Sequence, residues 1–302
     1  MDVTIVRISN QTKTKMTPYL LLALPMTIAL GLILYPILTV FYYSLFSYFP
    51  ARPYLNGFIG LENFANLWKD KLFWQALQVS IRWIFTQVPL QLIFGLCLAL
   101  LLNRSFRGRG IVRALTFAPW SLSGVIVAIM WTFLFNGNMG FINEVLKRVG
   151  VIDKSVAWLA NPDTVFGAVS VAELWRGIPF FAISLLASLQ SIPLELYESC
   201  DIDGGGRFSK FFYITLPYLK NTIILTTLLR TVWEFNAVDV IMVATGGGPL
   251  GKTTTLSIFL ADLAIKNRNF GYGSAVGVTS FCIMFAFAVL YLKSSGFGGA
   301  EK

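Results

Sequence analysis

The sequence lacks histidine altogether and has little charge for its length. Without His, a His-based catalytic triad, a His metal site and an imidazole pH switch are all excluded. Charged residues make up 13% of the 302 residues and apolar residues 56%, whereas a soluble domain has about 25% charged residues. So few charges cannot cover a globule of this size with a polar surface, which argues against a soluble single-domain enzyme.

Cysteine is also scarce. Cys97, Cys200 and Cys282 are far apart and show no CxxC spacing, so the sequence predicts neither a disulfide framework nor a metal site. The net charge of +9 could suggest nucleic acid as a partner. The basic residues, however, are spread among apolar runs instead of being massed on one element. This pattern favours membrane topology over nucleic-acid binding.

Long apolar stretches are what the sequence has in abundance. A helix that crosses a bilayer needs about 20 mostly apolar residues. Six stretches qualify, and they run approximately over residues 18–48, 74–102, 114–135, 165–189, 217–244 and 273–292. We therefore predict an all-α integral membrane protein with six transmembrane helices. Residues 1–302 are expected to form a single transmembrane domain, in which 1–16 is a cytoplasmic segment and 17–48 the first helix.

The loops predict the orientation. Six spans put both termini on one side of the membrane, and basic residues are only slightly more numerous there. The short loop 103–113 decides the matter, because it carries four arginines and no acid, and short loops rich in Lys and Arg stay in the cytoplasm. We therefore expect both termini, this loop and the loop 190–216 to be cytoplasmic.

The loop 190–216 has the pattern of a helix–turn–helix elbow. Pro193 suits the first turn of a helix, Glu195 and Glu198 follow early in that helix, and the glycines 204–206 end it. A second amphipathic segment follows with Phe at helical spacing, and Pro217 opens the fifth span. Taken alone, the elbow could also be an amphipathic loop at the membrane interface.

This elbow resembles the EAA motif of ABC-importer permeases. Glu198, Ser199 and Cys200 fall in the E-A-A positions, and Asp203, Gly204 and Gly205 in the D-G-A positions. Further matches to the carbohydrate-uptake branch of the MalF/UgpA type lie at Trp175, 179–180, 189–193, 214–217, 235–236 and 245–249. The resemblance covers the permease core, residues 74–292, and implies the type I ABC-importer permease fold.

The resemblance implies a mechanism and a set of partners. The elbow would be the coupling helix, docked on one of two separate ATPase subunits that bind ATP and Mg²⁺, with Glu198 acting by charge and capping and Gly204 by permitting the tight turn. This chain would bind no cofactor and catalyse nothing. A second homologous permease would complete the pathway, and an extracytoplasmic solute-binding protein would deliver a carbohydrate. The location implied is a bacterial or archaeal plasma (inner) membrane.

A second motif matches a nucleotide-binding signature letter for letter. Residues 246–253 read G-G-G-P-L-G-K-T and fit G-x-x-x-x-G-K-[ST]. A P-loop also needs a parallel sheet and a helix behind the phosphates. The apolar run before the motif extends back to Pro217, too long for a strand, and no strand–helix alternation exists to build a sheet. We therefore predict an external turn.

Polar residues inside the spans mark either a pathway or contacts between helices. Arg230 and Glu234 are four apart and can pair, and Glu173 and Arg176 are three apart. We favour interhelical contacts for these two pairs. The residues predicted to line the substrate pathway, which offer an aromatic face, an amide and carboxylates to a sugar, are Trp175, Glu234, Asn236 and Asp239.

Two alternatives remain at the level of the residues. An ion-coupled secondary transporter would use intramembrane acids such as Glu173, Glu234 and Asp239, but it leaves the elbow without a role. An intramembrane enzyme would need paired acids or a Ser/Lys arrangement, and the spans contain no Lys at mid-depth. The ATP-driven importer accounts for more of the sequence than either alternative.

Overall fold

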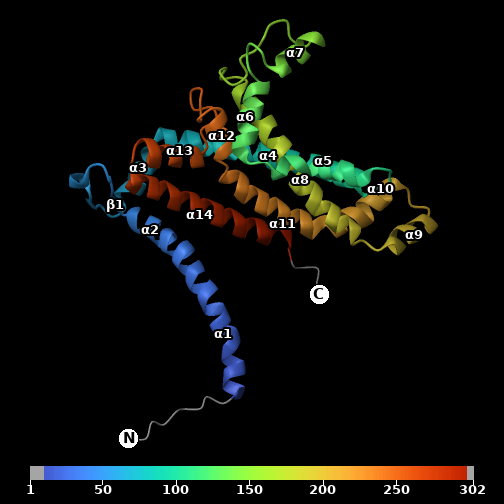
Figure 1. Cartoon of the computed structure of the whole chain (residues 1–302), viewed down its shortest axis with the longest axis horizontal. Coiled ribbons are helices and arrows are strands. Elements are labelled where there is room, and N and C mark those ends of the chain that lie inside the picture. Colours follow the sequence, from blue (N-terminus) through green and yellow to red (C-terminus); the bar gives the residue numbers. More distant parts are fainter. Residues whose placement is uncertain (1–9, 298–302) are drawn as a thin grey trace.

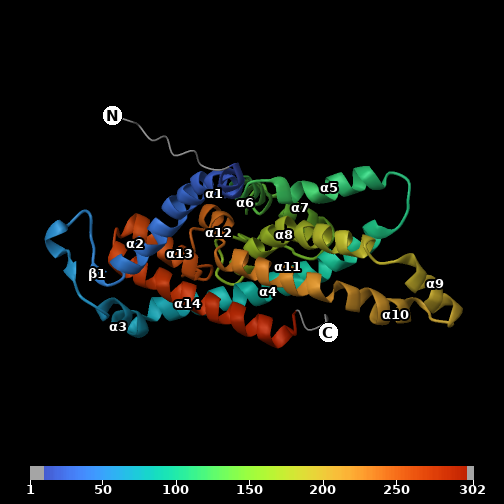
Figure 2. The same cartoon turned by 90° about the horizontal axis from the view of Figure 1, so that it is seen from below.

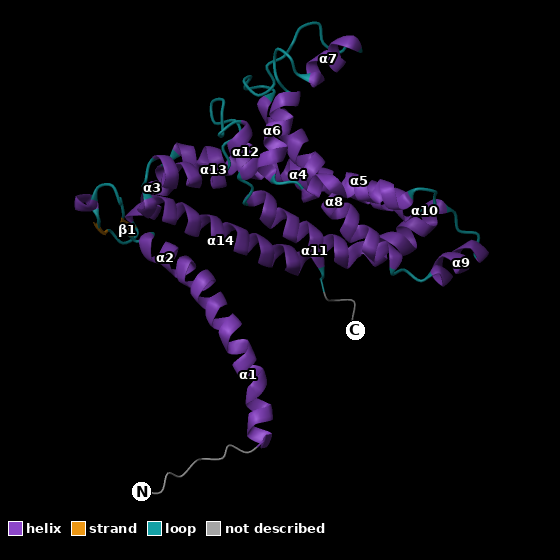
Figure 3. Ribbon diagram, in the orientation of Figure 1, coloured by secondary structure: helices purple, strands orange, loops and turns teal. Residues whose placement is uncertain are grey.

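The structure is a computed structural model that describes residues 10–297, most of which are helical. In this part of the chain the only strands are β1 (Phe46–Ser47) and β2 (Gly57–Phe58), an antiparallel pair. Figure 3 shows the helices and the loops between them. The predicted all-α class is therefore confirmed, and the long apolar stretches of the sequence are where the long helices lie.

The first span is a long curved rod that leaves the rest of the molecule (Figure 1). It consists of α1 (Asn10–Ala29), a π-helical turn (Leu30–Leu34) and α2 (Tyr35–Tyr43). Only the α2 end packs on the bundle, where Phe41 meets Phe281 edge-to-face. The helix begins within the predicted segment 1–16 and ends before residue 48, because Phe46 and Ser47 pair as a strand. Residues 1–9 of that segment lie outside the described residues.

Four helices form the central bundle. They are α4 (Lys71–Asn103), α8 (Val165–Gln190), α11 (Leu216–Phe235) and α14 (Phe270–Ser295). The most extensive contact is between α4 and α8, where a Cβ added to Gly95 would lie 2.5 Å from the Cβ of Phe181. Small residues permit this approach, which is how helices associate in a bilayer without a hydrophobic driving force.

By length and composition, α1–α2, α4, α8 and α14 can each cross a membrane, and the pair α5 (Arg109–Ser121) and α6 (Gly124–Leu134) adds a bent fifth candidate. The predicted span 114–135 is therefore interrupted, by a bend of 98° after Pro119. The predicted span 217–244 is interrupted too, because α11 ends at Phe235 and α12 (Asp239–Ala244) starts after a short non-helical link.

Some connecting elements lie at the two ends of the bundle, whereas α6 and the segment with α7 (Phe141–Arg148) project from its middle (Figure 1). The loop between α4 and α5 lies at the same end as α9 (Leu194–Ile202) and α10 (Arg207–Lys210), whereas β1 and α3 lie at the opposite end (Figures 1 and 2). A π-helical turn, Phe211–Thr215, joins α10 to α11. The remaining short helices are Pro53–Leu55, α3 (Glu62–Lys69), α13 (Leu256–Ala261) and the π-helical turn Asp262–Lys266.

Candidate functional site

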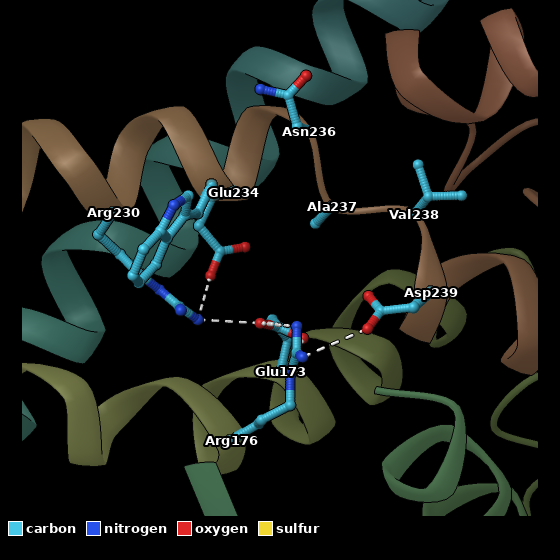
Figure 4. A pocket seen from close by; sticks show the side chains of 9 residues that line it. Glu173, Arg176, Arg230, Glu234, Asn236, Ala237, Val238 and Asp239 are labelled. Carbon is cyan, nitrogen blue, oxygen red and sulfur yellow. Dashed lines mark hydrogen bonds and ion pairs between the residues drawn. The ribbon is translucent and has the colours of Figure 1, made fainter. Parts of the chain in front are cut away.

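A polar cavity opens where α11 breaks. It has a volume of about 400 Å³ and lies between α8, the end of α11 and the start of α12 (Figure 4). The break is held by polar contacts: Ser257 donates a hydrogen bond to the carbonyl of Phe235 (2.7 Å), and Asn236 donates its side-chain N–H to Val232 (2.8 Å). The cavity is lined by Glu173, Arg176, Arg230, Trp233, Glu234, Asn236, Ala237, Val238 and Asp239.

An ion-pair network crosses this cavity. The two pairs that the spacing predicts are present, Arg230–Glu234 at 2.7 Å and Arg176–Glu173 at 3.0 Å. Glu173 also receives a hydrogen bond from Arg230 (2.9 Å), which joins α8 to α11. Arg176 extends the network to Asp239 at 3.3 Å. Two arginines thus stand against three carboxylates, and the charges largely balance within the site.

Helix α4 supplies the partners that sequence reasoning missed. Trp83 donates its indole N–H to Glu234 (2.8 Å), and Gln91 donates to the other oxygen of that carboxylate (2.9 Å). Gln91 in turn accepts from Arg230 (2.6 Å). The available signal was the spacing of Trp83, Gln87 and Gln91, which are four residues apart and therefore share one helix face.

The network divides into a buried part and a reachable part. Glu173 and Glu234 are 1% exposed and Arg230 is 5% exposed, so these groups hold the three helices together. The side chain of Asp239 is 40% exposed and that of Arg176 is 21% exposed, and Asn236 is exposed. A solute entering the cavity would therefore meet Arg176, Asn236 and Asp239, together with Trp233, which lines the cavity and is 42% exposed.

Two glycines leave room for this arrangement. A Cβ on Gly177 would overlap the Arg230 guanidinium and the Gln91 amide, and a Cβ on Gly124, the first residue of α6, would overlap the Asp239 carboxylate. Gly124 thus brings the bent third span against the broken fifth span. Discontinuous helices that meet in this way line binding sites in many transporters.

The structure places Trp175 away from this cavity. It lies on α8 and packs edge-to-face against Trp131 of α6, with ring centroids 6.1 Å apart. Its other neighbours are apolar residues of the core around Val127 and Val169. Asn236 and Asp239 lie on either side of the non-helical link between α11 and α12, and both line the cavity.

The elbow forms two helices around a glycine turn. Helix α9 starts directly after Pro193, and Asp203 ends it. Gly204 adopts φ +77°, which favours glycine, and Gly205 packs so closely on Cys200 that a Cβ would overlap the Sγ atom. Glu195 occupies the first turn and Glu198 lies further along the helix, so the predicted capping role does not fit Glu198.

The outer surface of the elbow combines charge with exposed apolar side chains. Glu198, Ser199, Asp203 and Gly204 are exposed, and Cys200 is half-buried. Leu194, Ile202 and Phe208 present between 74% and 87% of their surface. Lys210 pairs with Asp201 at 2.6 Å and ties α10 back to α9. The elbow is therefore an ordered protrusion with a mixed apolar and acidic surface.

The nucleotide-binding signature does not form a P-loop. The preceding segment is helix α12, and Lys252 and Thr253 are followed by a six-residue helix, α13. The hydroxyl of Thr253 is fully buried and hydrogen-bonds to Thr245 (2.9 Å) and to the carbonyl of Gly248 (3.0 Å). This segment is a turn closed on itself, as predicted, and it offers no phosphate cradle.

Comparison with known proteins identifies the class. The model of the family "binding-protein-dependent transport system inner membrane component" matches residues 91–295. The trehalose/maltose transport system permease protein MalF of Thermococcus litoralis is 36% identical over 282 residues, which cover 92% of this chain and 93% of that protein. The sulfoquinovosyl glycerol transport system permease protein SmoG of Agrobacterium fabrum is 34% identical over 274 residues, covering 90% and 88%.

A solved structure shares the fold. A chain of the bacterial ABC transporter involved in the import of the acidic polysaccharide alginate superposes with a TM-score of 0.83 at 20% identity, covering 97% of this chain and 99% of that one. The fold is therefore that of ABC-importer permeases, as the elbow predicts. The chain belongs to the family of inner-membrane components of binding-protein-dependent transport systems, and it is a transport subunit.

Proposed function

We propose that this chain is the carbohydrate-translocating permease subunit of an ATP-driven importer. The observation that carries the proposal is the polar cavity at the break between α11 and α12, in a family whose sequence-similar members are named for sugar transport. Sugar hydroxyls are hydrogen-bonded by amides, carboxylates and guanidinium groups. Arg176, Asn236 and Asp239 supply all three in the reachable part of the cavity.

In this proposal the cavity residues have different roles. Asp239 and Asn236 contact the solute, and Arg176 holds Asp239 in place. Glu234 lines the cavity, but its carboxylate is occupied by Trp83, Gln91 and Arg230, so it acts by positioning the helices. Trp175 acts outside the cavity, where it joins α8 to α6 through its contact with Trp131. The small volume of this cavity suits a sugar that passes through it. It also suits a cavity that forms one part of a pathway shared with a second homologous permease.

The elbow would couple transport to ATP hydrolysis on separate subunits. Within residues 190–216 the apolar side chains of Leu194, Ile202 and Phe208 are highly exposed, and they are suited to bury against a partner. We propose that each of two ATPase subunits binds ATP and Mg²⁺, that one of them receives α9 with Glu198, Ser199, Cys200 and the turn 203–205, and that a solute-binding protein docks outside. The permease core would span 74–292 within a single transmembrane domain, 1–302.

The proposed orientation puts the elbow, loop 103–113 and both termini in the cytoplasm of a bacterial or archaeal cell. The location of loop 103–113 and the elbow at one end of the bundle supports it. So does the excess of arginine in loop 103–113, because such short loops stay inside.

The test is ATP-dependent uptake by the complete complex in liposomes, with the solute found by screening its binding protein against sugars. We expect Asp239→Asn to reduce kcat/KM for uptake by about tenfold or more, because a charge-assisted hydrogen bond is lost. The matched control is Asp163→Asn, in the loop before α8, which should transport normally. Uptake by the lone chain without ATP would contradict the proposal and favour an ion-coupled carrier.

A further inference from the structure

The loop between α4 and α5, together with the start of α5, holds a concentration of positive charge that no carboxylate of residues 10–297 neutralises. Loop 103–113 contains four arginines and no acid. None of the four arginines pairs with a carboxylate among residues 10–297. The arginines are Arg104, Arg107, Arg109 and Arg113.

Two of these arginines are fixed in place. Arg109 and Arg113 are one helical turn apart on α5 and are half-buried, whereas Arg104 and Arg107 are exposed. With its amide oxygen turned toward them, Gln190 at the end of α8 accepts hydrogen bonds from Arg113 (2.7 Å) and Arg109 (3.0 Å). Arg113 also donates to the carbonyl of Leu102 at the end of α4 (3.2 Å). The pair therefore lies where α4 and α8 end and α5 begins.

The groups that contact this pair leave its charge uncompensated. An amide and a backbone carbonyl are neutral acceptors, and two guanidinium groups at this spacing repel each other. The Nε atoms of both arginines are buried without an acceptor. Such an arrangement is stabilised by an external anion. The planar guanidinium group of arginine can donate two parallel hydrogen bonds to a phosphate, which the ammonium group of lysine cannot do.

The surroundings indicate which phosphate. Val112, almost one turn after Arg109 on α5, and Phe106 in the loop before it are each 41% exposed, so apolar surface lies beside the arginine pair. An anion that carries apolar chains fits such a surface. Basic pockets between helices on the cytoplasmic side of a membrane bind phospholipid headgroups. We propose that Arg109 and Arg113, positioned by Gln190 and Leu102, bind the phosphate of an anionic phospholipid. The assignment of this lipid to the cytoplasmic leaflet rests on the orientation proposed above.

The test compares two charge-conserving double variants of the full chain. R109K/R113K keeps every positive charge, and therefore keeps the signal that orients the loop in the membrane. It removes the planar guanidinium groups that can bind a phosphate through two hydrogen bonds. R104K/R107K makes the same chemical change on the exposed side of the loop. The chain is equilibrated in micelles with equal amounts of dioleoylphosphatidylglycerol and dioleoylphosphatidylcholine, and bound lipid is counted by native mass spectrometry. We expect R109K/R113K to lose about fivefold in phosphatidylglycerol retention, and R104K/R107K less than about twofold.

Several outcomes would overturn the lipid site. Equal losses in both variants would indicate diffuse attraction to any basic surface, and equal retention of the two lipids would remove the anion requirement. If inorganic phosphate alone binds the wild-type chain and displaces the lipid, the ligand is a free anion. If lipid retention is unchanged but the ATPase no longer co-purifies with R109K/R113K, the site binds protein.

A third variant guards against misfolding. Gln190→Ala keeps all four arginines and removes only the acceptor that aligns two of them, so it should lower phosphatidylglycerol retention by about twofold to threefold. The readout is lipid binding alone. A negative result would therefore leave the transport proposal intact, whereas failure of ATP-dependent uptake would leave the lipid site intact.

Discussion

At the scale of single residues, the buried carboxylate of Glu234 has partners for both of its oxygens. Glu234 receives hydrogen bonds from Trp83 and Gln91 and pairs with Arg230. A buried carboxylate without partners would be very costly in a membrane interior. The full set of partners explains why an acid can lie 1% exposed in the middle of an apolar bundle.

Glycines on α8 give a prediction at this scale. Gly177→Ala places a Cβ on the Arg230 guanidinium and the Gln91 amide, whereas Gly167→Ala on the same helix meets nothing within 4 Å. In an open helical position Ala is better than Gly by about 1 kcal/mol. We expect Gly177→Ala to destabilise the protein by about 1–3 kcal/mol.

The measurement is the thermal unfolding of each variant in detergent, followed by tryptophan fluorescence. Gly167→Ala should unfold at the same temperature as the wild type or higher. A Gly177→Ala protein as stable as Gly167→Ala would mean that the contact between α8, α11 and α4 is looser than the structure has it.

At the scale of elements, the breaks are more informative than the regular helices. The bend between α5 and α6 and the break between α11 and α12 meet at Gly124 and Asp239. A straight helix satisfies its own backbone, so interrupted helices in a membrane occur where protein contacts or a water-filled cavity satisfy the freed groups. Here they border the polar cavity.

The elbow gives the prediction for elements. Glu198→Lys inverts a charge on the exposed surface of α9, and we expect ATP-driven uptake to fall at least about tenfold while the protein still inserts and unfolds normally, because a reversed interface charge costs binding. The measurement is uptake beside ATP hydrolysis in the reconstituted complex. Glu144→Lys, on the exposed helix α7, is the matched control and should leave both rates unchanged.

Normal uptake by the Glu198→Lys variant would count against the coupling role of the elbow. ATP hydrolysis that continues without uptake would be the clearest sign that the two processes have been separated.

At the scale of the whole molecule, the connecting elements at the two ends of the bundle differ. One end carries α9, α10 and loop 103–113 with its four arginines, and the other carries β1 and α3. The segment Leu21–Tyr43 has none of its apolar window buried within this chain. In a bilayer such a surface contacts lipid or another subunit, so the exposed rod is compatible with membrane insertion.

The orientation can be tested directly with single cysteines in a background without the native ones. Met139, beside α7, is 90% exposed and Ile202, at the end of α9, is 87% exposed. We expect Met139→Cys to react with a membrane-impermeant maleimide in intact cells, and Ile202→Cys to react only after permeabilisation. The reverse pattern would invert the proposed topology.

Much of this protein could be predicted from the sequence because its signals are local. Runs of apolar residues fix which segments are helical and buried in lipid, and one loop with four arginines indicates an orientation. Pro193 and the glycines at 204–206 predict the elbow, since both act on the backbone of their own neighbourhood. The pairs Arg230–Glu234 and Glu173–Arg176 follow from helical spacing alone.

Only the tertiary structure decided how these pieces meet. The end of α11 at Phe235 depends on Ser257, a residue far along the chain, and no strong helix-breaking residue marks it in the sequence. Likewise the partners of Glu234 come from α4, and Trp175 turns toward Trp131 rather than the cavity. Helical periodicity determines which residues share a face of one helix, but which helix that face meets depends on the packing of the whole bundle.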